Sequence, residues 1–365
     1  MKVPYTNFIK KNEPIRNKLI EAFEKVLDSG MYIEGSEVKA FEREFSNLCD
    51  TLYSTGISNG TCALHLALRA AGIGENDEVI TAPNSFIASA ASIAVVGAKP
   101  VFIDVLNDLN IDPDKIEQSI TSKTKAIIPV HLTGRPAQMK PINEIAKKYN
   151  LLVIEDAAQA IGAEYFGKKV GSLGDAACFS LHPLKNLHAF GDAGMFTTNN
   201  ERLINRIKIL KNHGLSDRST CDTFSFNCKL DEVQASLLRI QTPKLKEWNE
   251  ERRKLAFNYN KLLQKYALVP EEHEGEYNVY QTYIIQVKKR NELKKFLRDN
   301  EVEALVHYPQ PIHMQPAASD LNYKPEDFPN TLKLSEEILS LPIYPGLTID
   351  QQEYISNLFK KFYNN

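Results

Sequence analysis

Short apolar segments alternate with helix-like segments through the first half of the chain. The strand-like segments are 78–81, 100–105, 124–131, 151–155, 175–181 and 194–198, and helix-like stretches cover 61–72, 86–97 and 137–150. Alternation of this kind is typical of parallel strands connected by helices. The nearly continuous apolar run LLVI at 151–154 fits a strand that is buried on both faces. The sequence therefore predicts an α/β fold with a mostly parallel sheet flanked by helices.

The pattern changes near residue 240. Residues 230–265 resemble a long charged helical region that is interrupted at Pro243. A strand-like run at 278–287, a helix near 291–300 and a strand near 302–307 follow. We therefore expect a large domain over 1–245, including the N-terminal segment, and a smaller C-terminal α+β domain over 246–365. Two domains also suit a chain of 365 residues.

Composition excludes several classes of function. The 44 basic and 46 acidic residues leave a net charge of −2, which favours neither nucleic acid nor an anionic membrane. The N-terminus has no signal-peptide core, and the apolar stretch 86–98 is too short to span a bilayer. The five scattered cysteines argue against a disulfide framework and a structural metal site, so we expect a cytoplasmic protein without metal: Cys49, Cys62, Cys178, Cys221 and Cys228.

Two charged residues follow predicted strands. Asp156 comes directly after the strand 151–155, and Lys185 lies in the loop SLHPLKNL after the strand 175–181. Ligands of open parallel sheets bind at the carboxyl ends of the strands. Taken alone, Asp156 could hold a cation or metal, and Lys185 could be a solvated surface charge. Together they are the two partners that pyridoxal phosphate (PLP) needs, a lysine for the Schiff base and a carboxylate for the pyridinium nitrogen.

A third segment, SNGTCALHLALRAAG at 58–72, starts a predicted helix. The free N–H groups and positive dipole end of a helix N-terminus suit a phosphate. An ordinary helix cap explains the same residues when they are considered alone.

These segments together resemble the PLP-dependent sugar aminotransferases of fold type I, often called the DegT/StrS family. The resemblance covers nearly the whole chain and implies that fold, with PLP and its aminated form PMP as cofactors. The matching segments are MYIEGSEVKAFEREF (31–45), SNGTCALHLAL (58–68), APNSFIASA (82–90), PVFIDV (100–105), IIPVHLTGRPAQM (127–139), VIEDAAQAIGA (153–163), GDAACFSLHPLKNL (174–187), GDAG (191–194), NHG (212–214), HYPQPIHMQP (307–316) and LPIYPGLT (341–348).

The resemblance implies a role for each cofactor-binding position. Lys185 matches the Schiff-base lysine that later moves the proton, and Asp156 matches the partner of the pyridine nitrogen. The other matches are Gln159 near the ring hydroxyl, Gly60, Thr61 and Ser180 at the phosphate, Phe86 stacked on the ring, and Asn227 reaching the phosphate of a partner subunit. The active sites of a homodimer would then be shared between two chains.

The residues on the substrate side depart partly from the family. Lys229 and Ser225 stand where members often have the arginine and glycine of GxNxRM, and lysine lacks the bidentate fork that grips a carboxylate. His188 replaces a small residue, where it either narrows the acceptor pocket or is exposed. His307, Tyr308 and His313 match a loop that approaches substrate.

The implied activity is transfer of an amino group from L-glutamate to a keto sugar, most often nucleotide-linked and here with a preference for a 3-keto sugar, for glycan or antibiotic synthesis. The alternatives are a cyclitol, keto sugar acid or small phosphorylated ketone as acceptor, a PLP-dependent dehydratase, and a PLP-binding regulator. Lys185 argues against the dehydratase, because such relatives carry histidine there. The sequence has no GxGxxG fingerprint of a nicotinamide enzyme.

Overall fold

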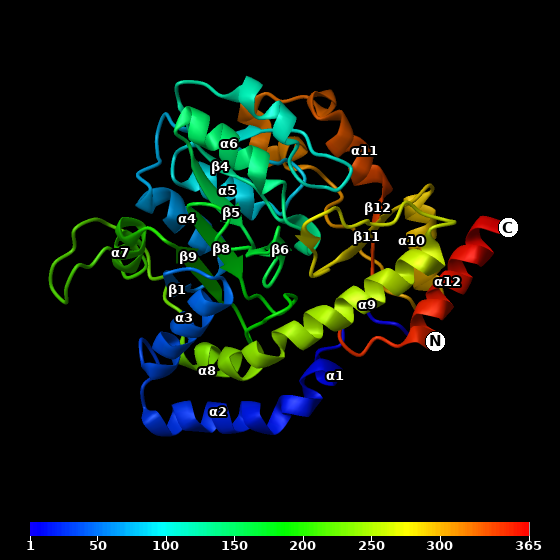
Figure 1. Cartoon of the computed structure of the whole chain (residues 1–365), viewed down its shortest axis with the longest axis horizontal. Coiled ribbons are helices and arrows are strands. Elements are labelled where there is room, and N and C mark those ends of the chain that lie inside the picture. Colours follow the sequence, from blue (N-terminus) through cyan, green and yellow to red (C-terminus); the bar gives the residue numbers. More distant parts are fainter. Residues whose placement is uncertain (365) are drawn as a thin grey trace.

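The computed structural model describes residues 1–364. A seven-stranded sheet forms its centre, in the order β1-β9-β8-β5-β4-β2-β3 (Figure 1). Strand β9 pairs antiparallel with both of its neighbours, and the other pairs are parallel. The strands are β1 (Tyr53–Ile57), β2 (Glu78–Thr81), β3 (Lys99–Phe102), β4 (Thr124–Ile128), β5 (Leu152–Asp156), β8 (Ala176–Ser180) and β9 (Gly194–Thr198). The expected mostly parallel α/β sheet is confirmed; β1 is a strand that the sequence pattern did not indicate.

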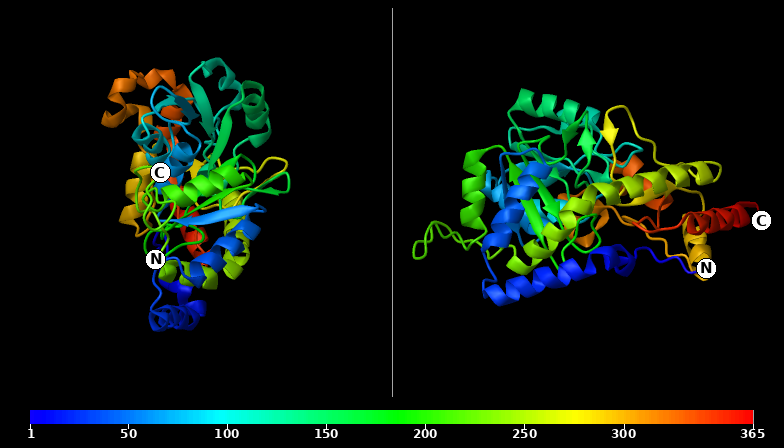
Figure 2. Two further views of the ribbon diagram at one scale, coloured as in Figure 1. Left: turned by 90° about the vertical axis from the view of Figure 1, so that its left-hand side faces the viewer. Right: turned by 60° about the horizontal axis from the view of Figure 1, so that its bottom comes forward.

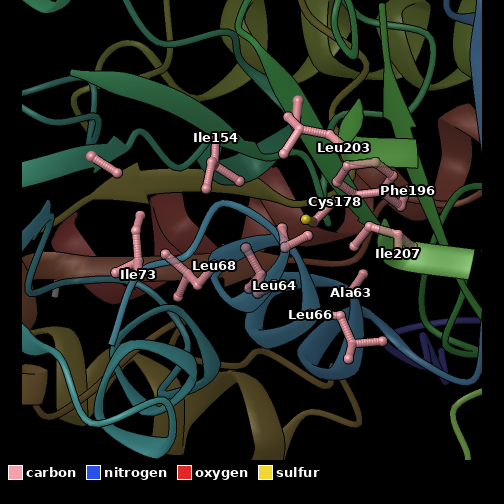
Figure 3. Packing of buried hydrophobic residues seen from close by; sticks show 14 of the residues in the cluster. Ala63, Leu64, Leu66, Leu68, Ile73, Ile154, Cys178, Phe196, Leu203 and Ile207 are labelled. Atoms are coloured by element: carbon pink, nitrogen blue, oxygen red, sulfur yellow. The ribbon is translucent and has the colours of Figure 1, made fainter. Parts of the chain in front are cut away.

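Helices cover both faces of this sheet because alternate strand residues point in opposite directions. In β8, Ala176 and Cys178 join the core on one face, and Ala177 and Phe179 join the core on the other. Figure 3 shows the first core, where side chains of one helix meet strands β5, β8 and β9. That face carries α4 (Gly60–Ala70), α5 (Ala88–Val95) and α7 (Glu201–Leu210), and the other carries α3 (Ser36–Leu48), α6 (Met139–Tyr149) and α8 (Glu232–Gln241).

The N-terminal segment lies outside these layers. Helix α2 (Arg16–Ser29) packs beside α8 along one end of the molecule, as Figures 1 and 2 show. Its buried residues Leu19 and Ala22 meet Leu237 and Trp248. The short helix α1 (Phe8–Asn12) precedes it and leads back toward the C-terminal part of the chain.

The C-terminal part has its own apolar core, in which Val3 also takes part. Its elements are α9 (Leu245–Leu263), β11 (Tyr283–Gln286), α10 (Arg290–Asp299), α11 (Pro329–Glu337), β12 (Ile338–Leu341) and α12 (Ile349–Asn364). A separate small sheet joins β10 (Glu276–Tyr277) to β6 (Glu164–Tyr165) and β7 (Lys168–Lys169). Both termini lie at this end of the molecule (Figure 1).

The strand expected near 302–307 does not form. Strand β11 pairs instead with β12, and the main chain of 302–307 meets β12 in a single isolated bridge, between Leu305 and Ser340. At its other end, Val302 bridges Val3. The segment is therefore divided between two neighbours, and Pro309 and Pro311 directly beyond it cannot donate to a ladder.

The interruption expected at Pro243 is present, because the turn Thr242–Lys244 separates α8 from α9. The division near residue 245 remains a proposal. Helix α9 begins there, and its residue Trp248 packs with α2 and α8 whereas Leu255 and Leu263 pack in the C-terminal core. Within residues 1–364, no helix combines the length and apolar character needed to cross a bilayer.

Candidate active site

The carboxyl ends of β1, β5 and β8 meet at one edge of the sheet, together with the start of β9. Asp156 ends β5, and the loop that carries Lys185 follows β8. The N-terminus of α4 follows β1 after a turn of two residues. The fold thus brings together the three segments that the sequence singled out.

Asp156 is a buried carboxylate with a donor on each oxygen. The Ser89 hydroxyl donates to Oδ2 at 2.7 Å, and the Ala158 N–H donates to Oδ1 at 3.2 Å. Burial raises the pKa of Asp156 above its ordinary value, while these two hydrogen bonds and the charge of Lys185 act to lower it. An ionised Asp156 here requires a cationic partner.

A fully buried hydrogen bond between His131 and Glu155 fixes the strand that carries Asp156. His131 Nε2 lies 2.9 Å from Glu155 Oε2, and His131 Nδ1 accepts a hydrogen bond from the Ala137 N–H. Since Nδ1 is an acceptor, Nε2 carries the proton and donates it to Glu155. The Glu155 carboxylate also accepts from the N–H groups of Gly171, Leu173 and Gly174.

Lys185 lies in a tightly held loop. The loop closes through Leu181 N–H to Ala193 O at 2.8 Å and Ala189 N–H to Leu181 O at 2.7 Å. Lys11 of α1 adds a hydrogen bond from its buried Nζ to Asn186 O at 2.8 Å. Burial lowers the pKa of Lys185 to about 8, and the charge of Asp156 opposes that decrease. Such an amine is partly neutral near neutral pH, as a nucleophile must be.

The start of α4 approaches the end of β8 very closely. The Asn59 side chain caps the helix by accepting from the Cys62 N–H at 2.8 Å. A Cβ on Gly60 would lie 2.9 Å from Ser180 Cβ, and a Cβ on Gly194 would lie 2.5 Å from Asn59 C. Only glycine fits at these two positions. The neighbouring Thr61 is exposed and Ser180 is half-buried, so both hydroxyls can face a ligand.

Gln159 and the aromatic residues Tyr308 and Phe86 lie next to one another. Gln159 Oε1 accepts from the Thr133 N–H at 2.7 Å, and its Nε2 lies 3.4 Å from the Tyr308 hydroxyl. The Tyr308 ring lies 5.8 Å from that of Phe86, which is largely exposed. Burial, with the nearby charge of Asp156, raises the pKa of Tyr308 to about 12, so Tyr308 stays a neutral hydrogen-bonding group.

The three expected histidines lie in different surroundings. His307 accompanies Tyr308, bonds Ser340 Oγ at 2.8 Å, and has its pKa lowered to about 4 by burial and the charge of Lys185. His313 instead packs on Phe328 with a ring separation of 4.7 Å. His188 is buried against Phe8 at 5.4 Å, and burial lowers its pKa to about 3.

Among residues 1–364, no hydrogen bond or ring contact links His188 or His313 to Asp156, Lys185 or Tyr308. The structure therefore does not bring these two histidines into the group. His188 is also not exposed, because α1 covers it, a tertiary contact that local sequence could not indicate.

Asn227 and Lys229 lie at the base of an arm. Residues between α7 and α8 extend away from the body of the molecule in Figure 1 and in the right-hand view of Figure 2. Asn227 is exposed there, and Lys229 Nζ donates to Asn212 Oδ1 at 2.9 Å. Arg69 of α4 holds the arm through Phe224 O at 2.9 Å. Asn227 is thus open to solvent, and no hydrogen bond within residues 1–364 links its side chain to Asp156.

Sequence reasoning missed several residues that support the site. Ser89, His131 and Glu155 hold Asp156 or its strand, and Lys11 holds the Lys185 loop. His131 had one signal, since it ends the predicted strand 124–131 as Asp156 follows 151–155. Ser89 and Lys11 had none, because their partners lie 67 and 175 positions away.

The residues present fit PLP. The chemistry of the donor set suits its three polar parts: a buried carboxylate for a ring nitrogen, an amine with a lowered pKa for the aldehyde, and a glycine-lined helix start for the phosphate. No group of three or more histidine, cysteine or acidic side chains within residues 1–364 is arranged to hold a metal ion.

Comparisons with known proteins give the same class. The family model of the DegT/DnrJ/EryC1/StrS aminotransferases matches residues 13–360. A "Pleiotropic regulatory protein" of Geobacillus stearothermophilus is 42% identical, with all of both chains covered. A dTDP-3-amino-3,6-dideoxy-alpha-D-galactopyranose transaminase of Aneurinibacillus thermoaerophilus is 41% identical over 99% of each chain.

A solved structure is also similar to this chain over its whole length. DesV of S. venezuelae, in complex with a ketimine intermediate, superposes with a TM-score of 0.97 at 35% identity, over 100% of this chain and 99% of that chain. Fold and site together define a fold type I PLP-dependent enzyme. The chain belongs to the DegT/DnrJ/EryC1/StrS aminotransferase family, which confirms the expected fold, cofactor and enzyme class.

Proposed function

We propose that this aminotransferase moves the amino group of L-glutamate to the keto group of a nucleotide-linked sugar, at carbon 3. The observation that carries the proposal is that Asp156 and Lys185 follow two neighbouring strands at one edge of the sheet. Asp156 is a buried carboxylate at the end of β5, and Lys185, whose pKa is lowered to about 8, lies in the loop after β8. The acceptor class is supported by the 41% identical relative, whose name describes a dTDP-linked 3-amino sugar. Such sugars serve the synthesis of glycans and antibiotics.

Each residue has a stated role. Bound PLP supplies an electron sink for the carbanion formed at the amino donor. Lys185 holds the cofactor covalently and, once displaced, carries the proton between carbon atoms on its Nζ. Asp156 stays ionised and keeps the ring nitrogen protonated. Main-chain N–H groups at Gly60 and Thr61, with the hydroxyls of Thr61 and Ser180, hold the phosphate.

The ring of PLP has two further neighbours. We assign Phe86 to stacking on the ring, because it is exposed and lies beside Tyr308. We assign Gln159 to the ring hydroxyl, because its buried amide is oriented by Thr133 and reaches toward Tyr308.

The substrate side is built by His307, Tyr308 and Lys229. His307 stays neutral, because burial and Lys185 lower its pKa to about 4, so it recognises substrate by hydrogen bonding. Lys229 would meet the carboxylate of the amino donor as a single positive charge. His188 and His313 have no part in this proposal, since no hydrogen bond or ring contact within residues 1–364 links either of them to Asp156, Lys185 or Tyr308.

We further propose a homodimer with shared active sites. Helix α2 and the residues after it expose an apolar surface formed by Ile20, Phe23, Leu27, Met31, Tyr32 and Ile33. Phe23 is 49% and Leu27 55% exposed. Asn227 lies on the arm between α7 and α8, where it can reach the phosphate of the partner's cofactor.

The five free cysteines support a reducing compartment such as the cytoplasm.

The experiment that tests this function is an absorption spectrum of the PLP-loaded protein before and after L-glutamate, followed by a panel of ketones. We expect the visible band to disappear with glutamate and to return only with a nucleotide-linked 3-keto sugar. If a cyclitol ketone, keto sugar acid or phosphorylated ketone restores the visible band better than the nucleotide-linked sugar does, that compound class replaces the proposed acceptor. A protein that binds no PLP would refute the proposal.

A second candidate function is a PLP-binding regulator. It is favoured by one observation, the 42% identical relative named "Pleiotropic regulatory protein". The Lys185→Ala variant separates the two functions, because transfer of an amino group requires the Lys185 amine. Retention of the biological effect by this variant would favour regulation, and its loss would favour catalysis.

A further inference from the structure

Ser89 lies at the first turn of α5 and is the only side chain within residues 1–364 that donates a hydrogen bond to Asp156. Ser89 is 1% exposed, and its Oγ lies 2.7 Å from Asp156 Oδ2. Because an ionised carboxylate can only accept, the Ser89 hydrogen points to Asp156. An O–H bond to an ionised oxygen at this distance is of the stronger, charge-assisted kind.

A second buried serine lies behind the first. Ser85 Oγ lies 3.0 Å from Ser89 Oγ and is 3% exposed. Since the Ser89 hydrogen is already committed to the carboxylate, Ser85 must be the donor in this bond. The two hydroxyls form a directed chain from Ser85 through Ser89 to Asp156, and each bond polarises the next.

The Asp156 carboxylate is therefore held at both oxygens. Ala158 N–H holds Oδ1 and Ser89 holds Oδ2. A carboxylate fixed in this way cannot rotate freely about its Cβ–Cγ bond. Both donors also favour its ionised form, against the burial that favours the neutral acid.

We propose that Ser89 is a positioning residue of the aminotransferase reaction: supported by Ser85, it keeps the Asp156 carboxylate ionised and oriented toward the ring nitrogen of PLP. The inference rests on the proposed role of Asp156. The other titratable groups around Asp156 are Lys185 of the β8–β9 loop, His131 beyond β4, Cys178 of β8 and Tyr308 of the C-terminal part.

Helix α5 itself supplies a matched control. Ser92 is as buried as Ser89, at 1% exposed, but its hydroxyl donates to the Ser89 main-chain oxygen at 3.1 Å. Ser92→Ala removes a buried hydroxyl from the same helix without touching Asp156. Ser89→Thr keeps the hydroxyl that bonds Asp156, and Ser89→Cys keeps the volume of the side chain with a much weaker donor.

The test is the dissociation constant of PLP, measured by titrating the cofactor-free protein from pH 5 to pH 9 in the wild type and in each variant. Ionised Asp156 and a neutral Lys185 amine both favour PLP binding, so affinity falls as pH decreases through the pKa values of both groups, and Ser89 is hydrogen-bonded to Asp156. Loss of one charge-assisted hydrogen bond raises the pKa of Asp156, so in Ser89→Ala we expect the part of the fall that belongs to Asp156 to begin about one pH unit higher, with about tenfold weaker binding on the acidic limb. The phosphate of PLP titrates identically for every variant.

The outcomes separate the inference from the function on which it depends. Unchanged profiles in Ser89→Thr and Ser92→Ala, with a displaced profile in Ser89→Ala, support the positioning role. If Ser89→Ala and wild type share one profile, or if Ser92→Ala moves as far, Ser89 has only a packing role. If Ser89→Ala does not fold by circular dichroism, Ser89→Cys decides in the same way. A wild type that does not bind PLP refutes the proposed function itself.

Discussion

At the scale of single residues, the site depends on two oppositely charged groups that modify each other's protonation. Burial lowers the pKa of Lys185 to about 8 and raises that of Asp156, while the charge of each partner acts in the opposite direction to burial. The lowered pKa lets Lys185 lose its proton near neutral pH, while the charge of Asp156 acts to keep the amine protonated.

The first prediction concerns the amine of Lys185. In the cofactor-free protein, the rate at which an acylating reagent labels Lys185 should rise through a midpoint near pH 8, the pKa to which burial lowers this amine. Asp156→Asn removes the negative charge that raises this pKa, so the midpoint should move lower still. The measurement is the labelled fraction of the Lys185 peptide by mass spectrometry. A midpoint near the ordinary lysine value of about 10.4 would contradict the model of the site.

A second prediction concerns Glu155, whose carboxylate accepts from His131 and from three main-chain N–H groups. Both carboxylate oxygens of Glu155 accept hydrogen bonds, so in Glu155→Gln the amide N–H₂ group must face N–H donors with which it cannot form hydrogen bonds. We expect the free energy of unfolding to fall by about 3 kcal/mol, because a buried network loses its acceptor.

Urea denaturation measures the change in Glu155→Gln. The exposed pair of Glu117 with Lys148 provides the control, and Glu117→Gln should leave the denaturation midpoint nearly unchanged. Equal denaturation midpoints for the two variants would show that the buried Glu155 carboxylate does not stabilise the folded protein.

At the scale of secondary structure elements, helix α4 and strands β8 and β9 form the end of the site that we assign to the phosphate. The helix begins directly against β8, at a distance that leaves no room for a side chain at Gly60 or Gly194. This contact fixes the free N–H groups of the first helical turn beside the end of β8, the strand that the Lys185 loop follows.

The third prediction tests that contact. Gly60→Ala places a Cβ 2.9 Å from Ser180 Cβ and 3.2 Å from Ser180 Cα, so α4 must shift. We expect PLP affinity to fall by at least about tenfold, measured by titration of the cofactor-free protein. Gly74→Ala, just beyond the same helix, meets its nearest atom at 3.4 Å and should bind PLP as the wild type does. Equal PLP affinities for the two variants would contradict the assignment of the phosphate to this end of α4.

At the scale of the whole molecule, two features lie exposed within the described residues 1–364: the apolar surface of α2 and the arm between α7 and α8. The apolar residues of α2 lie exposed at one end, and the arm between α7 and α8 carries Asn227 outward, with Phe224 91% exposed. Both features fit a second copy of the chain that covers the apolar surface and receives the arm.

The fourth prediction follows from a shared site. Lys185→Ala and Asn227→Ala should each be inactive or weak alone. When the two proteins are unfolded, mixed and refolded, random pairing should restore about a quarter of the wild-type sites, because each mixed dimer regains one intact site. Glutamate-dependent loss of the visible PLP band counts the intact sites. No recovery in mixed dimers, verified by mass, would place Asn227 in the site of its own chain.

Much of the site could be predicted from local sequence because it lies at strand ends. Asp156 and Lys185 each follow a strongly patterned strand, and in a parallel sheet such positions converge on one edge whatever the rest of the chain does. The start of α4 was predicted from a different local signal, the segment SNGT at 58–61 that opens a helix. The strand expected near 302–307 was wrong for the complementary reason, since β12 lies more than 30 residues beyond and nothing local selects it as the partner of β11.

The sequence by itself determined the α/β class, the aminotransferase family and the three segments that meet at PLP, because hydrophobic periodicity and short motifs are local properties. Only the tertiary structure decided which side chains support them: Ser89 on Asp156, His131 on Glu155 and Lys11 on the Lys185 loop. It also packed His188 against Phe8 and His313 against Phe328, contacts that the local sequence did not indicate. The reason is physical, since a contact between residues far apart in the chain exists only once the layers have packed.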